Sequence, residues 1–385
     1  MRETPQFIYI NNYKINVINN YLLNIYLIVK MLFTIQSICL NFVLSYNSIK
    51  EGWGQSAWLQ KYFCSHQRLN VELPKNIKLI ESHSNYMNKH QLYNNKEKFY
   101  QWLVGFTDGD GSFSITHQKS KEGKLRWGLY FKIGQSSYNL RALYYIKKEL
   151  KCGSVQIESK TKMADFRIRN REILNKNIFP IFDKYPLLTS KYYDYIKFKK
   201  AYLIMTDLNI TKEDKDYLLS KLINEKRPKN YISPIWEKIS YSVNSTYDAK
   251  YVMHKYWLIG FTEADGSFYI VKKDSFRLVH SFEITQKLDI IVLESIGRIL
   301  GISVKRKKKY KTIVTSNSRA ISNILEYYKK TMKGMKALEY RIWARSFLRN
   351  KGNYIELNKT RNLMRKIRYI RLDKNFHIKN NDIIF

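Results

Sequence analysis

The stretch LVGFTDGDGSF at residues 103–113 recurs almost unchanged as LIGFTEADGSF at residues 258–268. Apolar residues recur at helical spacing through the start of each copy, which predicts helices at residues 96–109 and 250–264. Each copy ends in closely spaced carboxylates and small residues. An internal repeat of this kind indicates two copies of one structural unit within one chain.

The hydrophobic period changes to two directly after each predicted helix. Phe113 and Ile115 alternate with hydroxyl residues, and similar alternation predicts strands at residues 129–133 and 278–284. Two more strands and a helix are expected in the same order in both copies. The strands are expected at residues 154–160, 164–169, 302–309 and 310–315, and the helices at residues 139–150 and 291–300. Each copy is therefore expected to be an α+β unit.

Small residues are spaced four apart in both predicted motif helices. Gly105 and Gly109 share one helical face in the first copy, as Gly260 and Ala264 do in the second. Such a face lets two helices approach more closely than the usual ~8–10 Å between axes. We therefore expect the two motif helices to pack on each other, so that the chain forms two pseudo-symmetric halves.

Asp110 and Asp265 fall at the C-terminal ends of these two helices. The helix dipole is negative there, and a second carboxylate lies close by, so both effects disfavour ionisation unless a cation is present. Mg²⁺ takes oxygen ligands and is usually held by one or two carboxylates together with substrate phosphate. The pair therefore predicts a site for metal-assisted phosphodiester hydrolysis.

The net charge indicates a polyanionic partner. The chain has 68 Lys and Arg against 32 Asp and Glu, a formal net charge of +36, and only nine of the basic residues precede residue 96. A folded region with this excess favours nucleic acid as its partner. Cys39, Cys64 and Cys152 form no close pair, which excludes a zinc finger and a disulfide framework.

The chain divides into five expected segments. An apolar stretch at residues 21–46 contains Lys30, which is costly near the middle of a membrane span. We hold three interpretations of the leader: a poorly ordered segment, translated flanking sequence, or a membrane anchor. The expected segments are the leader at residues 1–95, the first repeat at 96–225, a linker at 226–249, the second repeat at 250–365 and a basic tail at 366–385.

The two motif copies, their spacing, the strand pattern and the charge together resemble single-chain LAGLIDADG homing endonucleases over residues 96–350. The resemblance implies two αββαββα halves that pack through paired motif helices, each with a curved antiparallel sheet that binds DNA. It implies that Asp110 and Asp265 ligate Mg²⁺ or Mn²⁺. Asp108 and Glu263 match a motif position with a capping or structural role, so they are not expected to be ligands.

The resemblance also implies further catalytic residues. A glutamine at the end of the second strand corresponds to Gln135 and Gln286. A basic residue further along the chain corresponds to Lys191 and, through the shared pattern K-x-x-[DE]-Y, to Lys336. A lysine beside a phosphate stabilises developing charge. The expected catalytic set is Asp110, Asp265, Gln135, Gln286, Lys191 and Lys336.

Outward side chains of the two sheets are expected to contact bases and phosphates in a major groove. The expected contacts are Ser114, Thr116, Gln118, Lys132, Gln156, Lys160, Arg167, Arg169, Tyr269, Lys273, Arg277, Lys305 and Lys307. The two halves differ at nearly all of these positions, so we expect an asymmetric double-stranded DNA target.

The function expected from these features is a Mg²⁺-dependent, site-specific double-strand DNA endonuclease that initiates homing of its own intron. We expect a monomer without a small-molecule cofactor, located in the mitochondrial matrix, since the composition is typical of AT-rich genomes and the family is common there. One alternative is an RNA maturase that assists splicing of the host group I intron, with or without DNA cleavage. Another is a DNA-binding repressor that does not cut.

Overall fold

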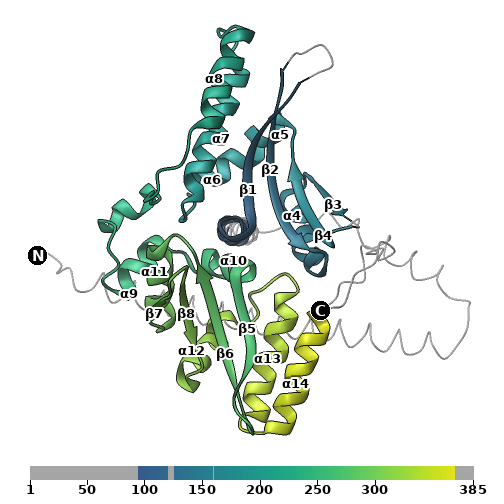
Figure 1. Ribbon diagram of the computed structural model, residues 1–385, viewed down its shortest axis with the longest axis vertical. Helices are drawn as coiled ribbons and strands as arrows, with labels where there is room; N and C mark the ends of the chain where they lie inside the picture. Colours follow the sequence, from purple (N-terminus) through teal and green to yellow (C-terminus); the bar gives the residue numbers. More distant parts are fainter. Residues whose placement is uncertain (1–93, 120–124, 159, 369–385) are drawn as a thin grey trace, which may run out of the picture. The chain divides into compact units, whose positions relative to one another are not determined.

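The computed structural model describes residues 94–119, 125–158 and 160–368 (Figure 1). The interpretations of the leader fall almost entirely on residues 1–93, and those of the basic tail mainly on residues 369–385. Both segments lie outside the described residues. Within the described part of the chain, no helix has the length and hydropathy that a membrane span requires.

The first half begins with a helix at residues 94–110, the first motif helix. It leads into a four-stranded antiparallel sheet, the first sheet, with strand order β1-β2-β4-β3. The strands are β1 (Gly111–Lys119), β2 (Leu125–Ser136), β3 (Ser154–Glu158) and β4 (Met163–Ile168). The helical elements are η1 (Ser137–Asn139), α4 (Leu140–Leu150), α5 (Arg171–Ile173), η2 (Leu174–Ile178), α6 (Phe179–Lys184), α7 (Lys191–Thr206) and α8 (Lys212–Asn224).

The second half repeats this order. Its motif helix is α10 (Lys255–Asp265), and its antiparallel sheet, the second sheet, has strand order β5-β6-β8-β7. The strands are β5 (Gly266–Asp274), β6 (Arg277–Gln286), β7 (Val304–Arg306) and β8 (Lys311–Thr315). The helices are α11 (Ile290–Leu300), α12 (Ser318–Tyr328), α13 (Lys336–Asn350) and α14 (Tyr354–Arg368).

Helices cover one face of each sheet (Figure 1). Helix α4 packs on β2, β3 and β4, and α7 on β1, while α11 to α14 cover the second sheet. The covered faces carry the alternating apolar residues, such as Phe131 and Phe166 in the first half and Phe268 and Phe282 in the second, all of which are buried. The predicted α+β fold with two pseudo-symmetric halves is confirmed.

The two motif helices meet at their glycines. A methyl group built on Gly105 would overlap the carbonyl oxygen of Trp257 in α10, and one built on Gly260 would overlap the carbonyl oxygen of Trp102 in the first motif helix. Backbone therefore touches backbone at this crossing, and only a residue without Cβ fits at either position. This contact joins the two halves, as the spacing of small residues predicts.

The prediction of one helix at residues 250–264 was wrong at its start. Helix α9 (Thr246–Val252) ends before the motif, and α10 begins at Lys255. The backbone of His254 is extended, and its Nδ1 accepts a hydrogen bond from the backbone N–H of Tyr256 at 3.2 Å. His254 therefore acts as the N-cap of a new helix, a role that periodicity alone does not reveal.

The expected strand at residues 302–309 is shorter than predicted. Strand β7 ends at Arg306, and the backbone N–H of Lys307 donates to the carbonyl of Tyr310 at 2.8 Å. This bond closes a turn that leads into β8. Much of the densest basic run of the sequence therefore lies in a turn rather than along a strand.

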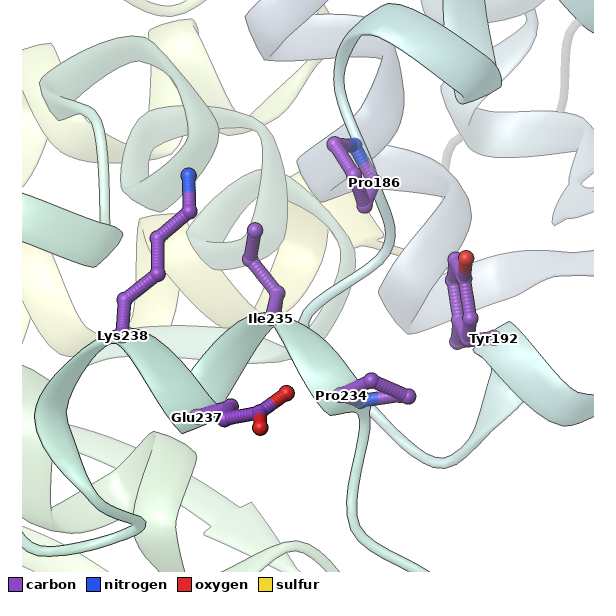
Figure 2. Close-up of a pocket in the computed structure, with 6 residues that line it drawn as sticks. All are labelled: Pro186, Tyr192, Pro234, Ile235, Glu237 and Lys238. Carbon is purple, nitrogen blue, oxygen red and sulfur yellow. The ribbon is translucent and has the colours of Figure 1, made fainter.

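The expected linker at residues 226–249 contains the 3-10 helix η3 (Pro234–Ile239), which packs against the first half, and the start of α9, which packs against α11 of the second half. Trp236 is fully buried, and its indole N–H donates to the carbonyl of Leu188 at 2.8 Å. Ser233 donates to the carbonyl of Leu187 at 2.7 Å. Beside these contacts lies a largely apolar pocket lined by Pro186, Tyr192, Pro234, Ile235, Glu237 and Lys238 (Figure 2). The linker thus supports the segment that precedes Lys191.

Candidate active site at the helix seam

The two motif aspartates lie beside each other at the ends of the paired helices. Asp110 is the last residue of the first motif helix, and Asp265 is the last residue of α10. A methyl group built on Gly109 would lie 3.5 Å from the carboxyl carbon of Asp265, so the second carboxyl group reaches the end of the first helix. The close packing of the helices therefore brings the two carboxyl groups together.

Each aspartate accepts a hydrogen bond from the glutamine of its own half. The side-chain amide of Gln135, near the end of β2, donates to Oδ2 of Asp110. The amide of Gln286, the last residue of β6, donates to Oδ2 of Asp265 at 2.5 Å. The structure thus brings together the four residues that the sequence places at the ends of helices and strands.

The two predicted lysines lie at the C-terminal ends of the motif helices. The Nζ of Lys191 donates to the carbonyls of Thr107 at 3.1 Å and Gly109 at 2.5 Å. The Nζ of Lys336 donates to the carbonyl of Gly266. A cation at this end of a helix satisfies free carbonyls and offsets the negative end of the dipole. All six predicted catalytic residues therefore gather at one seam.

The other motif acids, Asp108 and Glu263, hold the loops that carry the lysines. Asp108 accepts from the backbone N–H groups of Leu188 and Thr189 at 2.8 and 3.1 Å. Glu263 accepts from those of Lys333 and Gly334, at 2.9 and 2.6 Å. Both acids are almost fully buried, with 4% and 1% of their surface exposed. Their oxygens are thus occupied by protein donors.

A tryptophan from the opposite helix completes each of these two sites. The indole N–H of Trp257 donates to Asp108 at 2.8 Å, and that of Trp102 donates to Glu263 at 2.6 Å. Each acid therefore links the lysine loop of its own half to the motif helix of the other half. These tryptophans are not among the residues predicted from the sequence, although one precedes each motif copy directly and the repeat could have revealed them.

Burial alters the ionisation of the whole seam. Burial, followed by the charge of Asp110, raises the pKa of Asp265 to about 6. Burial also raises the pKa of Asp110, while the bond from Gln135 and the charges of Lys191 and Lys336 oppose that change. Burial lowers the pKa of both lysines. Two carboxyl groups that resist ionisation together are typical of a site that binds a cation.

Two further polar residues at the seam were missed by the sequence analysis. Asn139 donates to Oε1 of Gln135 at 2.8 Å, and its own Oδ1 accepts from the backbone N–H of Met335 at 2.8 Å. Asp289 accepts from the backbone N–H of Ser190 at 2.7 Å. Both residues occupy the N-cap position of the helix that follows the second strand. Their position shortly after each glutamine was the available signal.

Most of the predicted DNA contacts in the first half lie on the face of the first sheet opposite the helices, the outer face. Six of them share this face by strand register, and most of their strand neighbours on the opposite face are buried or half-buried: Ser114, Thr116, Gln118, Lys132, Gln156 and Arg167. Arg169 follows β4 and lies over the ring of Tyr130, 4.6 Å from its centre. Lys160 lies in the turn between β3 and β4.

Basic side chains of the first sheet surround one acid. Arg167 forms two hydrogen bonds with Asp165, at 2.5 and 2.6 Å, and Lys132 lies 3.6 Å from the same carboxylate. Lys132 is nevertheless exposed. The centre of the first outer face is therefore rich in donors.

The second sheet places its predicted contacts less uniformly. Tyr269 and Lys305 lie on its outer face, and Lys273 lies at a register shift in β5. Arg277 begins β6, and Lys307 lies in the turn after β7. These residues are exposed apart from the half-buried Tyr269.

An acid that was not predicted occupies the middle of the second outer face. Glu283 accepts hydrogen bonds from Tyr269 at 3.0 Å, Thr285 at 3.2 Å and Thr312 at 3.1 Å. It pairs with Ser267, two residues after Asp265, as Lys132 pairs with Ser112, two residues after Asp110. Glu283 and Lys132 therefore occupy equivalent positions with opposite charge.

Both halves of the chain are similar to the same family of known proteins. The sequence matches the LAGLIDADG endonuclease family over residues 103–202 and 258–347. A probable intron-encoded endonuclease of Schizosaccharomyces pombe, Cox1-I1b, is 43% identical over 282 residues, which cover 71% of this chain and 70% of that protein. The uncharacterised mitochondrial protein RF1 of Saccharomyces cerevisiae is 36% identical over 214 residues, which cover 54% of this chain and 40% of RF1.

Solved structures share the fold. The homing endonuclease I-SmaMI bound to cleaved DNA superposes with a TM-score of 0.57 at 26% identity, over 69% of this chain and 95% of that one. I-GzeII in complex with its DNA target superposes with a TM-score of 0.56, over 68% and 96% of the two chains. At 24% identity, the second likeness concerns the fold alone.

Proposed function

Since this chain belongs to the LAGLIDADG endonuclease family, we propose that it is a site-specific double-strand DNA endonuclease that cuts a long asymmetric target by Mg²⁺-assisted hydrolysis and so initiates homing of its intron. One observation carries the proposal. The carboxyl groups of Asp110 and Asp265 meet at the seam between the halves, each bonded to a glutamine and close to a lysine.

The residues at the seam fit a hard divalent cation. Asp110 and Asp265 provide oxygen ligands, and the raised pKa of both shows that their charges lack full compensation from the protein. Across the described residues, no three or more His, Cys, Asp and Glu side chains gather at one metal site. A pair of carboxylates such as Asp110 and Asp265 is the arrangement expected for Mg²⁺ or Mn²⁺. Mg²⁺ keeps several waters and uses one or two carboxylates with substrate phosphate.

The protein's own groups have distinct roles in the proposed reaction. Asp110 and Asp265 hold the metal, which when bound neutralises the scissile phosphate and lowers the pKa of a water. Gln135 and Gln286 hold the carboxylates in place through their amide N–H groups. Lys191 and Lys336 place positive charge beside the carboxylates, where it stabilises the phosphate as charge develops. Asp108 and Glu263 keep the lysine loops in position.

The raised pKa of Asp265 predicts how metal binding depends on pH. The folded carboxyl ionises at about 6 and the ordinary one at 3.8. Between these values the unfolded chain has lost the proton and the folded chain keeps it, so without metal this group's contribution to stability falls as pH rises. Asp108, also raised to about 6 by burial, acts in the same direction. A divalent cation needs the ionised form, so its stabilising effect grows as pH rises.

We therefore expect excess MgCl₂ to raise the melting temperature more at about pH 7.5 than at about pH 5, on either side of the folded pKa. Thermal unfolding followed by circular dichroism measures this difference. Asp265→Asn serves as the control, and in this variant most of the difference between the two pH values should disappear. An equal increase at both pH values would contradict the assignment of the metal to this carboxyl.

The outer faces of the sheets support recognition of an asymmetric target. Lysine presents donors, which suit the N7 and O6 acceptors of guanine in the major groove, and glutamate accepts from the N4 amine of cytosine. Lys132 and Glu283 occupy equivalent positions of the two halves. The two half-sites are therefore expected to differ at one related base pair, with guanine favoured beside Lys132 and cytosine beside Glu283.

Charge reversal tests this expectation. We expect Glu283→Lys to change the preferred base at one position of one half-site, and Lys132→Glu to do so at the related position of the other half-site. Each change should be worth about 1–3 kcal/mol of discrimination. Selection of bound sequences from a randomised DNA library measures the preference. Glu326→Lys, the same charge change at an exposed position of α12, is the control and should leave the selected sequence unaltered.

Plasmid cleavage tests the function itself. Purified protein and Mg²⁺ are incubated with DNA that spans the intronless insertion site of the host gene. A specific double-strand cut is the expected result. Failure to cut, combined with tight binding to the host intron RNA, would overturn the proposal in favour of the RNA maturase. Binding to DNA without cutting would favour the repressor.

The remaining expectations are part of the same proposal. The two relatives described above include an intron-encoded and a mitochondrial protein, which supports a location in the mitochondrial matrix. Both halves of the proposed site come from one chain, which supports a monomer bound to double-stranded DNA. We propose that the reaction uses no small-molecule cofactor.

A further inference from the structure

Two N-cap residues at the seam do not cap their own helices. Asn139 precedes α4 and Asp289 precedes α11, and neither side chain bonds to the first turn of its helix. Asn139 instead accepts from the N–H of Met335, and Asp289 from the N–H of Ser190. Met335 and Ser190 directly precede the two lysines of the site. Each residue therefore connects its own half to the lysine loop of the other half.

The bond from Met335 determines which way the side chain of Asn139 faces. A backbone N–H can only donate, so it requires the amide oxygen of Asn139. The amide nitrogen of Asn139 then faces Gln135 and donates to Oε1 at 2.8 Å. The nitrogen of Gln135 is left to donate to Asp110, whose carboxylate, in the ionised form that would hold a metal, can only accept. Both ends of the chain of bonds thus require the same orientation of Gln135.

The surroundings of Asn139 leave little room for an alternative. The residue is 6% exposed, and a methyl group built on Gly334 would lie 2.5 Å from its Oδ1. Water cannot easily replace either of its bonds, and the loop before Lys336 passes close by. The orientation of Gln135 is therefore built into the packing between the halves.

In the second half, the residue equivalent to Asn139 does not orient the glutamine in this way. Asp289 uses its two oxygens to accept from the N–H and, at 3.0 Å, the hydroxyl of Ser190. A carboxylate has no N–H to donate to the amide oxygen of Gln286. Gln286 is therefore oriented by its bond to Asp265 and receives no orienting donor from the residue equivalent to Asn139.

We propose that Asn139 is a positioning residue of the cleavage reaction, which acts through Gln135 on Asp110 and makes the two halves of the active site unequal. The inference rests on the proposed endonuclease function. Its consequence is that cutting of one DNA strand depends on Asn139 and cutting of the other does not.

Asn139→Asp tests this directly, because it keeps an oxygen for the N–H of Met335 and removes the donor to Gln135. The amide of Gln135 is then drawn to the new carboxylate and away from Asp110. We expect cleavage of one strand to slow by about ten- to hundredfold, the effect of losing a hydrogen bond to a charged group. The other strand should be cut within about twofold of the wild-type rate, and nicked plasmid should accumulate. Single-turnover cleavage of a target labelled at both 5′ ends gives the two rates.

Matched variants separate positioning from folding. Asn317→Asp makes the same chemical change at the N-cap of α12, where the side-chain oxygen accepts from Arg319 and Ala320, and should alter neither rate. In a Gln135→Ala background, Asn139→Asp should have no further strand-specific effect. Should Asn139→Asp prevent folding, as judged by thermal unfolding, Asn139→Ala decides, since it removes the donor to Gln135 without adding a carboxylate. It must slow one strand only and have no further strand-specific effect in the Gln135→Ala background.

The outcomes are distinct. Selective slowing of one strand that disappears in the Gln135→Ala background supports the inference. Equal slowing of both strands, or of neither, while the wild-type protein cuts both, overturns the inference and leaves the endonuclease function intact. A wild-type protein that cuts neither strand overturns the proposed function, and this inference with it.

Discussion

Asp110→Asn and Asp265→Asn should each remove double-strand cleavage while DNA binding remains. Asparagine has the shape of aspartate, and its oxygen can still accept from Gln135 or Gln286, so the seam keeps its packing. It has lost the charge that holds a divalent cation. A loss of about 3–5 kcal/mol of transition-state stabilisation corresponds to about 10²–10⁴-fold in rate.

Cleavage rates and binding affinity must be measured on the same target for both variants. Asp207→Asn, at the C-cap of α7, is a matched control, because its oxygen accepts from the backbone N–H of Asn209 and an amide oxygen can do the same. Asp110→Asn has a second expected effect. It removes the charge that helps to raise the pKa of Asp265, so Asp265 should ionise at lower pH. Full activity in either variant would remove both residues from the proposed mechanism.

Gly105→Ala and Gly260→Ala should each destabilise the protein strongly. Alanine normally stabilises a helix relative to glycine by about 1 kcal/mol. Here the new methyl group would overlap a backbone carbonyl of the other helix, which cannot move without separating the halves. We expect the free energy of unfolding to fall by about 3 kcal/mol or more, which is at the upper end of the values for overpacked cores. At about 2.1 cal/mol/K of unfolding entropy per residue, such a loss lowers the melting temperature of a protein of this size by about 4–5 °C or more.

Thermal unfolding measures the effect, and Gly134→Ala in β2 is the control. A methyl group built on Gly134 meets no atom within 4 Å. The free energy of unfolding of Gly134→Ala should therefore stay within about 0.5 kcal/mol of the wild-type value. A stable Gly105→Ala variant would mean that the motif helices do not touch through their backbones.

The repeat made the architecture predictable, because two similar copies constrain each other. The glycine spacing indicated the helix contact, and the change of period indicated the sheets. The break at His254 was not predictable from periodicity, since an imidazole that accepts from Tyr256 is an uncommon helix start. The early end of β7 was missed because a run of lysines gives no sign of where a strand turns.

The site was predictable where residue type and position both repeat. Asp110, Gln135 and Lys191 have counterparts of the same type in the second half, so comparison of the copies identifies them. Asn139 and Asp289 differ in type, and their distances to the two glutamines differ by one residue. Their partners are backbone N–H groups 196 and 99 positions away, respectively, and no local pattern signals such contacts.

The crossed tryptophans have a consequence for how such proteins can be recombined. Trp257 supports the loop of Lys191 through Asp108, and Trp102 supports the loop of Lys336 through Glu263. A chimera that joins one half of this chain to the opposite half of a relative separates both indole–carboxylate pairs at once, since each pair has one member in each half. Compatibility then depends on matching side-chain length across the junction, since Asp108 and Glu263 differ by one methylene. Because each acid and its tryptophan lie in opposite halves, hybrids should succeed where the relative carries an acid of matching length, and a tryptophan, at the corresponding positions.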